Sequence, residues 1–231
     1  MGQAIVRLAS DIDDLTVAAV WVRDPAKAEI DAGEGVVLSA DLDTVVAAAN
    51  VLIDFSLPGA TGEILAAVGR NATPLVCGVS GLDDTQISAL RAASKTLPIV
   101  YDRNMSQGIA VLDTVVHDVA KSLGPEFSVE IHETHHVHKK DAPSGTALKL
   151  GETLAGARDM ASAADIHYES ERRGEVPGDH SVIFSSSSER LELSHSVTTR
   201  DVFAEGALRA ASWVVRQNPG QYSMRDVLFG E

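Results

Sequence analysis

Residues 51–80 have the sequence VLIDFSLPGATGEILAAVGRNATPLVCGVS, which begins and ends with a short β-rich run. Between these runs, residues 59–70 show the apolar spacing of a helix. The same alternation extends in both directions, with strand-like runs at 17–22 and 97–101 and helical stretches at 41–50 and 83–95. Strands that alternate with helices predict an α/β fold with a parallel sheet.

The pattern changes after a predicted helix at 107–122. Three strand-like runs follow one another without intervening helices, and a strand and a helix precede them. The predicted order is a strand at 127–136, a helix at 144–156 and strands at 166–171, 180–186 and 190–197. Such an order is typical of an antiparallel or mixed sheet in a separate α+β domain. A helix at 203–215 and the segment 224–228 are expected to return to the first domain.

The chain has 231 residues, of which 45% are hydrophobic, so it is long enough to bury a substantial core. Its 33 acidic residues against 19 basic ones give a formal net charge of -14, which disfavours nucleic acid as a partner. No apolar run approaches the length of a membrane span, and the start has no signal-peptide pattern. The single cysteine, Cys77, excludes an internal disulfide framework, and a cytoplasmic location is expected.

Residues 130–147, EIHETHHVHKKDAPSGTA, hold the densest chemical information in the chain. Four histidines suggest a metal site, but their spacing matches no standard zinc pattern and no cysteine is near, so we expect no metal. A solvated histidine-rich loop is the plain alternative. Two adjacent lysines and an SGT helix start favour an anion site instead, because a helix N-terminus attracts negative charge. A plain N-cap is the commoner role for residues such as Ser144 or Thr146, and the cap and the anion site are compatible.

Imidazoles, ammonium groups and a helix start together describe a pocket for a small anionic substrate that must be protonated. Reduction of a C=N or C=C bond conjugated to a carboxylate has this requirement, since a hydride arrives from a cofactor and a general acid supplies the proton. Charged groups alone do not distinguish this chemistry from hydrolysis. A hydrolase that uses Ser144 with His135 is disfavoured, because Ser144 lies in no nucleophile-elbow pattern.

The run ETHHVHKKDAPSGTA at 133–147 resembles the signature of the 4-hydroxy-tetrahydrodipicolinate (dihydrodipicolinate) reductase family, which acts in lysine and diaminopimelate biosynthesis. Weaker similarities run through the rest of the chain, at DFSLP (54–58), CGVSG (77–81), NMSQG (104–108), RRGEVPGDH (172–180), ERLELSH (189–195), FAEGALRAA (203–211) and MRDVL (224–228). The resemblance implies an NAD(P)H-dependent reductase with a Rossmann-like domain, a small dicarboxylate as substrate and a homotetrameric assembly.

The resemblance also implies roles for particular residues. His135 would be the catalytic acid and Lys139 its partner in proton donation. The substrate carboxylates would be held by His136, Lys139, Ser144, Gly145 and Thr146. Cofactor contacts would fall at strand ends, the usual binding edge of a parallel sheet, on Phe55, Ser56, Gly78, Val79, Ser80, Asp102, Arg103, Asn104 and Met105. The implied domains are a dinucleotide-binding domain at 1–106 and 207–231 and a substrate-binding and oligomerisation domain at 107–206.

Arg23 suggests the preferred cofactor. It follows the strand-like run 17–22, at the place where an acidic residue would bind the ribose 2′-hydroxyl of NADH. An arginine there favours a 2′-phosphate, so NADPH is expected to be preferred to NADH. The alternative is a surface arginine paired with Asp24.

The chain departs from the family at its start. The helix-like segment 4–10 has no strand before it, whereas the family begins with a strand and a glycine-rich turn. We interpret this as a start codon assigned too late or a trimmed chain, and a genuinely shortened protein is the alternative. The chain as it stands is expected to bind dinucleotide poorly. A non-catalytic dicarboxylate-binding relative that has lost cofactor binding is therefore the competing hypothesis.

Overall fold

The computed structural model describes residues 1–230, which form two compact units. Unit 1 comprises Met1–Ser106 and the chain from Asp201 onward, and unit 2 comprises Gln107–Arg200. The sequence analysis placed the return to the first domain at residue 207. In the structure residues 201–206 belong to unit 1, because they form the first part of helix α7 (Asp201–Val214), whose Ala204 and Gly206 are buried.

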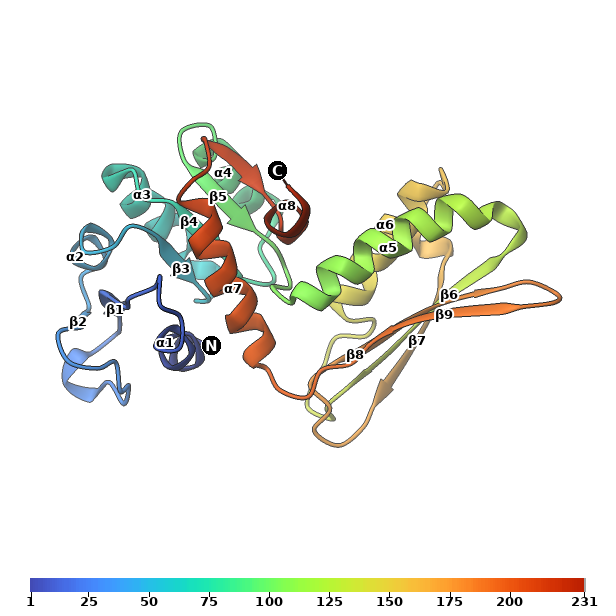
Figure 1. Ribbon diagram of the computed structural model, residues 1–231, viewed down its shortest axis with the longest axis horizontal. Helices are drawn as coiled ribbons and strands as arrows, with labels where there is room; N and C mark the ends of the chain where they lie inside the picture. The colour runs from blue at the N-terminus through green and yellow to red at the C-terminus, as the bar shows by residue number, and fades with distance from the viewer. Residues whose placement is uncertain (231) are drawn as a thin grey trace. The chain divides into compact units, whose positions relative to one another are not determined.

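Unit 1 contains two separate parallel sheets (Figure 1). The smaller sheet pairs β1 (Ala19–Trp21) with β2 (Val37–Ser39). The larger sheet has the order β10-β5-β4-β3, formed by Gly220–Tyr222, Pro98–Tyr101, Leu75–Cys77 and Leu52–Asp54. The parallel strands β1, β3, β4 and β5 agree with the sequence prediction, whereas β2 and β10 were not predicted.

Helices cover both faces of the larger sheet. Their bounds are α1 (Gly2–Ala9), α2 (Leu42–Ala47), α3 (Thr61–Asn71), α4 (Asp84–Ala93), α7 and α8 (Met224–Phe229). Ile64 and Leu90 pack from α3 and α4 onto Leu75 and Ile99, while α7 contacts β3, β4 and β5. Because β4 has a helix on each side, all of its residues are buried, as expected for a strand inside a doubly covered parallel sheet.

A cavity of about 970 Å³ lies in unit 1 between the two sheets. Residues of both β1 and β3 line it, together with α1, α2 and part of α7. In the described residues β1 pairs only with β2 and β3 only with β4, so each has one strand edge without a strand partner. The sheet predicted from the sequence is therefore divided at this cavity.

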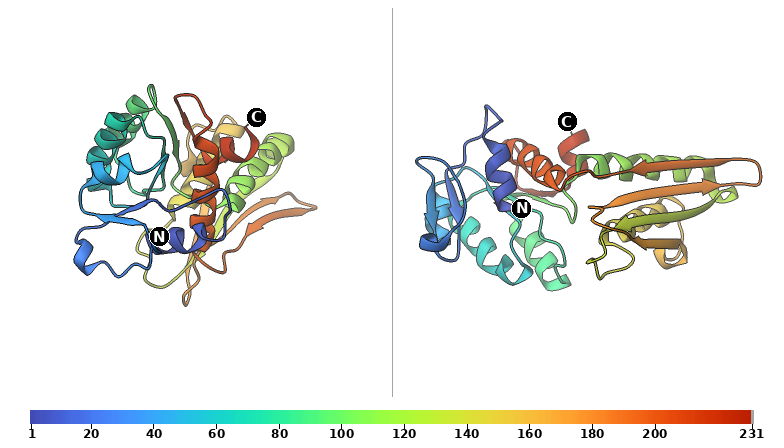
Figure 2. Two further views of the ribbon diagram at one scale, coloured as in Figure 1. Left: turned by 60° about the vertical axis from the view of Figure 1, so that its left-hand side comes forward. Right: turned by 90° about the horizontal axis from the view of Figure 1, so that it is seen from below.

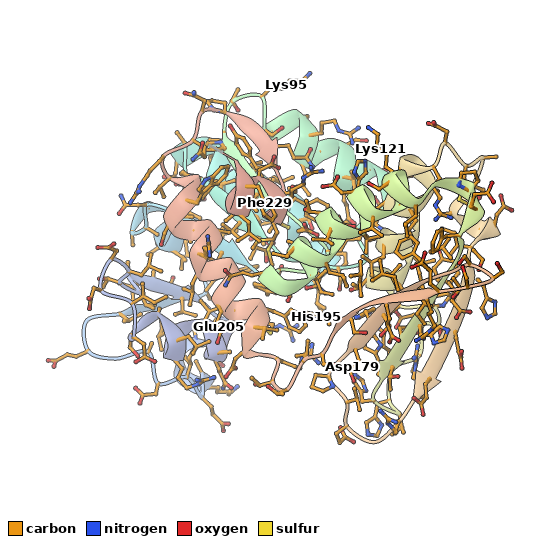
Figure 3. All side chains as sticks on the ribbon, turned by 45° about the vertical axis from the view of Figure 1, so that its right-hand side comes forward. Lys95, Lys121, Asp179, His195, Glu205 and Phe229 are labelled. Carbon is orange, nitrogen blue, oxygen red and sulfur yellow. The ribbon has the colours of Figure 1, made fainter. Side chains whose placement is uncertain are left out.

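Unit 2 has a single four-stranded mixed sheet in the order β7-β6-β8-β9. Its strands are β6 (Ser128–His135), β7 (His167–Arg172), β8 (Asp179–Ser185) and β9 (Arg190–His195). The β6 and β7 pair is parallel and the other two pairs are antiparallel, which confirms the predicted mixed sheet. Asp179 and His195 lie at the same end of this sheet (Figure 3).

Helices α5 (Gln107–Leu123) and α6 (Gly145–Ala157) pack on one face of this sheet, as the view from below shows (Figure 2). Strand alternation places Ile131, Val182 and Phe184 on the covered face, where they are almost fully buried. Glu133 and His135 follow Ile131 at steps of two, so they point to the same side. The segment 133–147 therefore starts with two polar side chains that lie on the buried face of the sheet.

Short 3-10 helices occupy Pro25–Lys27, Pro58–Ala60, Gly124–Glu126 and Ala163–Asp165. None of the helices among residues 1–230 is long and apolar enough to cross a membrane.

Candidate active site

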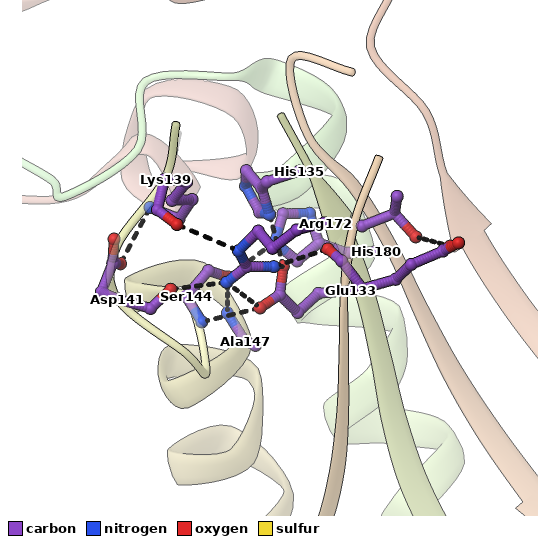
Figure 4. Close-up of polar contacts among 10 residues, drawn as sticks. Glu133, His135, Lys139, Asp141, Ser144, Ala147, Arg172 and His180 are labelled. Atoms are coloured by element: carbon purple, nitrogen blue, oxygen red, sulfur yellow. Dashed lines mark hydrogen bonds and ion pairs between the residues drawn. The ribbon is translucent and has the colours of Figure 1, made fainter. Parts of the chain in front are cut away.

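The predicted substrate-binding segment runs from the end of β6, through the loop 136–143, to the start of α6 (Figure 4). The loop ends in a cis Ala142-Pro143 bond, and Ser144 is the N-cap of α6. Hydrogen bonds from Arg173 N to the carbonyl oxygen of His135 (2.8 Å) and from Val137 N to that of Gly174 (3.1 Å) attach the loop to the chain beyond β7. These bonds hold the start of the segment, and its other end is the N-cap of α6.

Glu133 is the central acceptor of the site, and its side chain is fully buried. Arg172 donates two hydrogen bonds to it, from Nη1 to Oε2 and from Nη2 to Oε1, both at 2.9 Å. Ser144 N donates to Oε1 at 3.2 Å, and Oε2 contacts Nδ1 of His135. Burial works to raise the pKa of Glu133, but the hydrogen bonds from Arg172, Ser170 and His135 outweigh it and hold the pKa below its usual value.

His135 lies on the same face and is 8% exposed. Burial lowers its pKa below the usual value, and the Glu133 carboxylate offsets part of this effect. The nearby positive charges of Lys139 and Arg172 lower the pKa further. The ring of His180 meets that of His135 edge to face, with centroids 5.1 Å apart. His135 is therefore a neutral histidine in the free protein at pH 7, and an added negative charge nearby would make it easier to protonate.

Ser144 is also buried, and its hydroxyl oxygen makes two polar contacts. Its Oγ accepts a hydrogen bond from Ala147 N at 3.1 Å and lies 3.0 Å from Nε2 of His180. Burial lowers the pKa of His180 to about 3, so this imidazole is neutral at physiological pH. Of the two roles considered for Ser144, the cap is present, and the first-turn N–H of Gly145 is left with no carbonyl acceptor in the helix.

The predicted partner Lys139 is held in the loop. Its Nζ is 2.8 Å from Oδ2 of Asp141, which is largely exposed. The guanidinium of Arg172 also bonds the carbonyl oxygens of Lys139 and Asp141. Arg172 therefore joins the buried carboxylate of Glu133 to the loop that carries the lysine.

The structure thus brings His135, Lys139, Ser144, Gly145 and Thr146 to one end of β6 and the adjoining start of α6. His136 follows directly, and its ring lies beside that of the exposed His138. His132 points to the opposite face of the sheet, where its Nε2 is 3.3 Å from Glu169. Among residues 1–230, no group of three or more His, Cys, Asp or Glu side chains is placed to hold a metal ion.

In unit 1, nine of the ten predicted cofactor residues follow β3, β4 and β5 at the carboxyl ends of adjacent parallel strands. A Cβ on Gly78 would fall 2.5 Å from the ring of Phe55, so only glycine allows this close packing. Val79 and Met105 are almost fully buried, which leaves only their backbone for a ligand. Asp102 bonds Met224 N at the start of α8 through Oδ2 (3.3 Å). The turns after β3 to β5 lie at the carboxyl-end edge of a parallel sheet, where ligands usually bind.

Arg23 lies apart from these residues, because it follows β1 in the smaller sheet. It is exposed and lines a shallow cavity together with Lys27. The alternative pairing with Asp24 is not present. The Asp24 carboxylate instead contacts Nζ of Lys27 at 3.1 Å and accepts a hydrogen bond from Ala26 N.

Two family models match this chain. The C-terminal model of dihydrodipicolinate reductase matches residues 108–228 and the N-terminal model matches residues 1–105. The chain belongs to the dihydrodipicolinate reductase family. Members of this family are NAD(P)H-dependent oxidoreductases of lysine and diaminopimelate biosynthesis.

Relatives within the dihydrodipicolinate reductase family align over nearly the whole chain. The 4-hydroxy-tetrahydrodipicolinate reductase of Xanthomonas campestris pv. campestris (strain B100) is 44% identical over 99% of this chain and 93% of its own length. That of Halorhodospira halophila is 39% identical over 99% of this chain and 94% of its own length. The resemblance stated from the sequence is therefore confirmed.

Solved structures agree on the fold. The dipicolinate-bound dihydrodipicolinate reductase from Paenisporosarcina sp. TG-14 superimposes with a TM-score of 0.82, at 21% identity, over 96% of this chain and 92% of its own. An amine dehydrogenase from Mycobacterium smegmatis gives a TM-score of 0.63 at 11% identity, with 97% and 92% covered. Both are similar in fold, and the dihydrodipicolinate reductase is the closer of the two.

The sequence analysis missed Glu133, Arg172 and His180 as members of the site. One signal was available for Glu133, since it occupies the middle of an alternation Ile131, Glu133, His135 in which the first residue is a core residue. A carboxylate on a buried strand face requires partners. For Arg172 and His180 no local signal exists, because only the sheet register places them opposite His135 and Glu133.

Proposed function

We propose that this chain reduces 4-hydroxy-tetrahydrodipicolinate to tetrahydrodipicolinate, with His135 as the general acid. One hydride and one proton are added, and the hydroxyl group leaves as water. The observation that carries the proposal is the convergence of His135, Lys139 and the N-terminus of α6 around one end of β6. This arrangement supplies a proton donor, a positive charge and backbone donors within one small region.

The substrate carboxylates are proposed to bind Lys139, His136 and the first-turn backbone of α6 at Gly145 and Thr146. Ser144 contributes by capping the helix, because its hydroxyl is buried and already bonded to Ala147 N. The Asp141 carboxylate that contacts Lys139 is exposed, so a substrate carboxylate can take its place. Negative charge next to His135 then raises its pKa and makes the ring a proton donor.

NAD(P)H, when bound, supplies the hydride. The residues proposed to hold its nicotinamide end are Phe55, Ser56 and the turn Gly78 to Ser80, together with the turn Asp102 to Met105. Arg23, with Lys27 in the same shallow cavity, is proposed to favour the 2′-phosphate of NADPH. Comparison of kcat/KM for NADPH and NADH tests this preference. Arg23→Ala should reduce the ratio, the exposed Arg91→Ala should leave it unchanged, and a clear NADH preference of the unmodified chain would refute it.

We further propose a homotetramer in the cytoplasm. Assembly through unit 2 is supported by the polar sheet face opposite the helices, which carries His132 and Glu169 from adjacent strands. The location follows from the activity, because the cytoplasm holds the pyridine nucleotides that the reaction consumes. Light scattering of the purified chain tests the assembly, and a monomer at micromolar concentration would contradict it.

The activity itself is tested by following NADPH oxidation with enzymatically generated substrate, at cofactor concentrations up to the millimolar range. A high cofactor range is necessary because β1 and the strands β3 to β5 lie in separate sheets, so weak dinucleotide binding is expected. Calorimetry with dipicolinate, a stable dicarboxylate, tests the substrate site separately. Micromolar or tighter NADPH binding would contradict the expected weak affinity.

These two measurements also separate the competing function. Dipicolinate binding without turnover at any cofactor concentration would identify a dicarboxylate-binding relative. Turnover that requires His135 supports the reductase, and a chain that neither binds dipicolinate nor oxidises NADPH would refute both.

A further inference from the structure

Glu133 has no role in the proposal above, although its side chain is fully buried and touches His135. A buried carboxylate is costly unless every oxygen is bonded. Here each oxygen receives two donors, with Arg172 and His135 on Oε2 and Arg172 and Ser144 N on Oε1. The carboxylate is therefore held as an ion.

An ionised carboxylate has only lone pairs to offer, so the ring nitrogen that faces it must carry a hydrogen. Nδ1 of His135 is that nitrogen. In the neutral ring the hydrogen then lies on Nδ1, and Nε2 holds the lone pair.

The other ring nitrogen lies beside Gly178. A Cβ built on Gly178 would lie 2.9 Å from Nε2 of His135, so glycine at this position keeps a side chain from covering this nitrogen. The His180 ring packs edge to face against this imidazole. Nδ1 thus faces Glu133, and Nε2 faces Gly178.

We propose that Glu133, held by Arg172, is a positioning residue that fixes the hydrogen of His135 on Nδ1. Nε2 is then the atom that takes up a proton from solvent when the anionic substrate binds and that delivers this proton to the substrate. The inference rests on the proposed function for the delivery step, but the tautomer is a property of the chain alone. Arg172 has two roles, because it neutralises the charge of Glu133 and also donates a hydrogen bond to the loop that carries Lys139.

The titratable groups around His135 come from three strands and one loop. Glu133 stands on β6, Arg172 on β7, His180 on β8 and Lys139 in the loop. Only Glu133 is negative, so it is the one group among these that raises the pKa of His135. Loss of this charge must therefore lower the pKa of His135.

The decisive experiment is long-range ¹H–¹⁵N NMR of the intact, unmodified protein with ¹⁵N-labelled histidine. Signals of His135 are assigned by their loss in His135→Asn. At pH 7.5 we expect Nδ1 protonated and Nε2 unprotonated. A hydrogen on Nε2, or rapid exchange between the two tautomers, would overturn the proposal. This measurement needs neither substrate nor turnover, so it is independent of whether the proposed reductase activity is found.

The pH profile of kcat/KM gives the second readout. Activity that needs protonated His135 falls at high pH, and Glu133→Gln should move this limb to lower pH by about one unit or more, a loss of roughly tenfold on the limb. Glu171→Gln is the matched control, because Glu171 bonds Thr134 on the opposite sheet face. An unmoved limb in a folded Glu133→Gln protein would overturn the positioning role. If that variant does not fold, the tautomer of His135 in the unmodified chain still tests the proposal.

Discussion

The sheets of the two units differ in continuity. Unit 2 joins four strands into one sheet, and its site groups are bonded to one another across three of them. Unit 1 divides its strands between two sheets with a cavity of about 970 Å³ between them. One chain can therefore contain a closely bonded polar site in one unit and a divided sheet in the other, since each unit has its own core.

The largest expected effect is the loss of kcat when the site of unit 2 is altered. His135→Ala and Lys139→Ala should each lower kcat by roughly 10²- to 10⁴-fold, because a positioned general acid contributes that much. Steady-state kinetics at saturating NADPH measure the decrease in kcat. The melting temperature, recorded in parallel, shows whether each variant is folded. His138→Ala is the control, since His138 is exposed, contacts the exposed Glu175 and is assigned no role in the site. Near-normal turnover in both variants would remove the assignment.

Hydrogen exchange tests the contrast between the two sheets. The amides of β1 should exchange at least about 10²-fold faster than those of β8, because β1 has one strand neighbour and borders the cavity, whereas β8 is paired on both sides. Mass spectrometry of peptides that cover residues 17–22 and 180–185 gives the comparison. The doubly paired β4 is the control within unit 1. Equal protection of β1 and β4 would show that the division of the sheet has no energetic consequence.

A glycine substitution measures how tightly unit 1 is packed away from the cavity. Gly206→Ala should destabilise unit 1 by about 1–3 kcal/mol, because the new Cβ would lie 1.7 Å from the carbonyl oxygen of Met105 and backbone cannot easily yield. Urea unfolding followed by tryptophan fluorescence is suitable, since Trp21 and Trp213 both belong to unit 1.

Gly69→Ala is the matched control, because Gly69 is also helical and a Cβ added there would have nothing within 4 Å. It should be neutral or stabilise by up to about 1 kcal/mol. A Gly206→Ala protein as stable as Gly69→Ala would show that α7 can move away from Met105.

The pH dependence of stability tests the packing of unit 2. The pKa of His180 is about 3 in the folded protein, against an ordinary value of 6.5. Below pH 6.5 the unfolded chain binds a proton that the folded protein does not take up until about pH 3. The free energy of unfolding should therefore fall as the pH drops through this window, by about 1.4 kcal/mol per pH unit from this group. The lowered pKa values of His135 and His195 act in the same direction.

Urea unfolding of unit 2, followed by the backbone NMR signals of β8 between pH 7 and pH 5, measures this slope. His180→Gln should flatten it, and His138→Gln should not. If both variants keep the full slope, His180 is not the group responsible.

Much of the fold was predictable because its signals are local. Apolar spacing located β3, α3, β4 and β5 to within a few residues, and the run from Glu133 to Ala147 identified the family and the site segment. Val37–Ser39 and Gly220–Tyr222 were missed, because these strands are defined by their pairing with β1 and β5, which no local run of residues shows.

The amino-acid sequence alone was enough to establish the two kinds of sheet, the strongly negative net charge and the presence of an acid, a cation and a helix start in one short segment. The three-dimensional structure was needed to show that Arg172 and His180 join that segment, that β1 lies in a separate sheet from β3, and which nitrogen of His135 faces Glu133. Periodicity and motifs are properties of neighbouring residues, whereas strand register and side-chain partners depend on segments far apart in the chain, which no local pattern encodes.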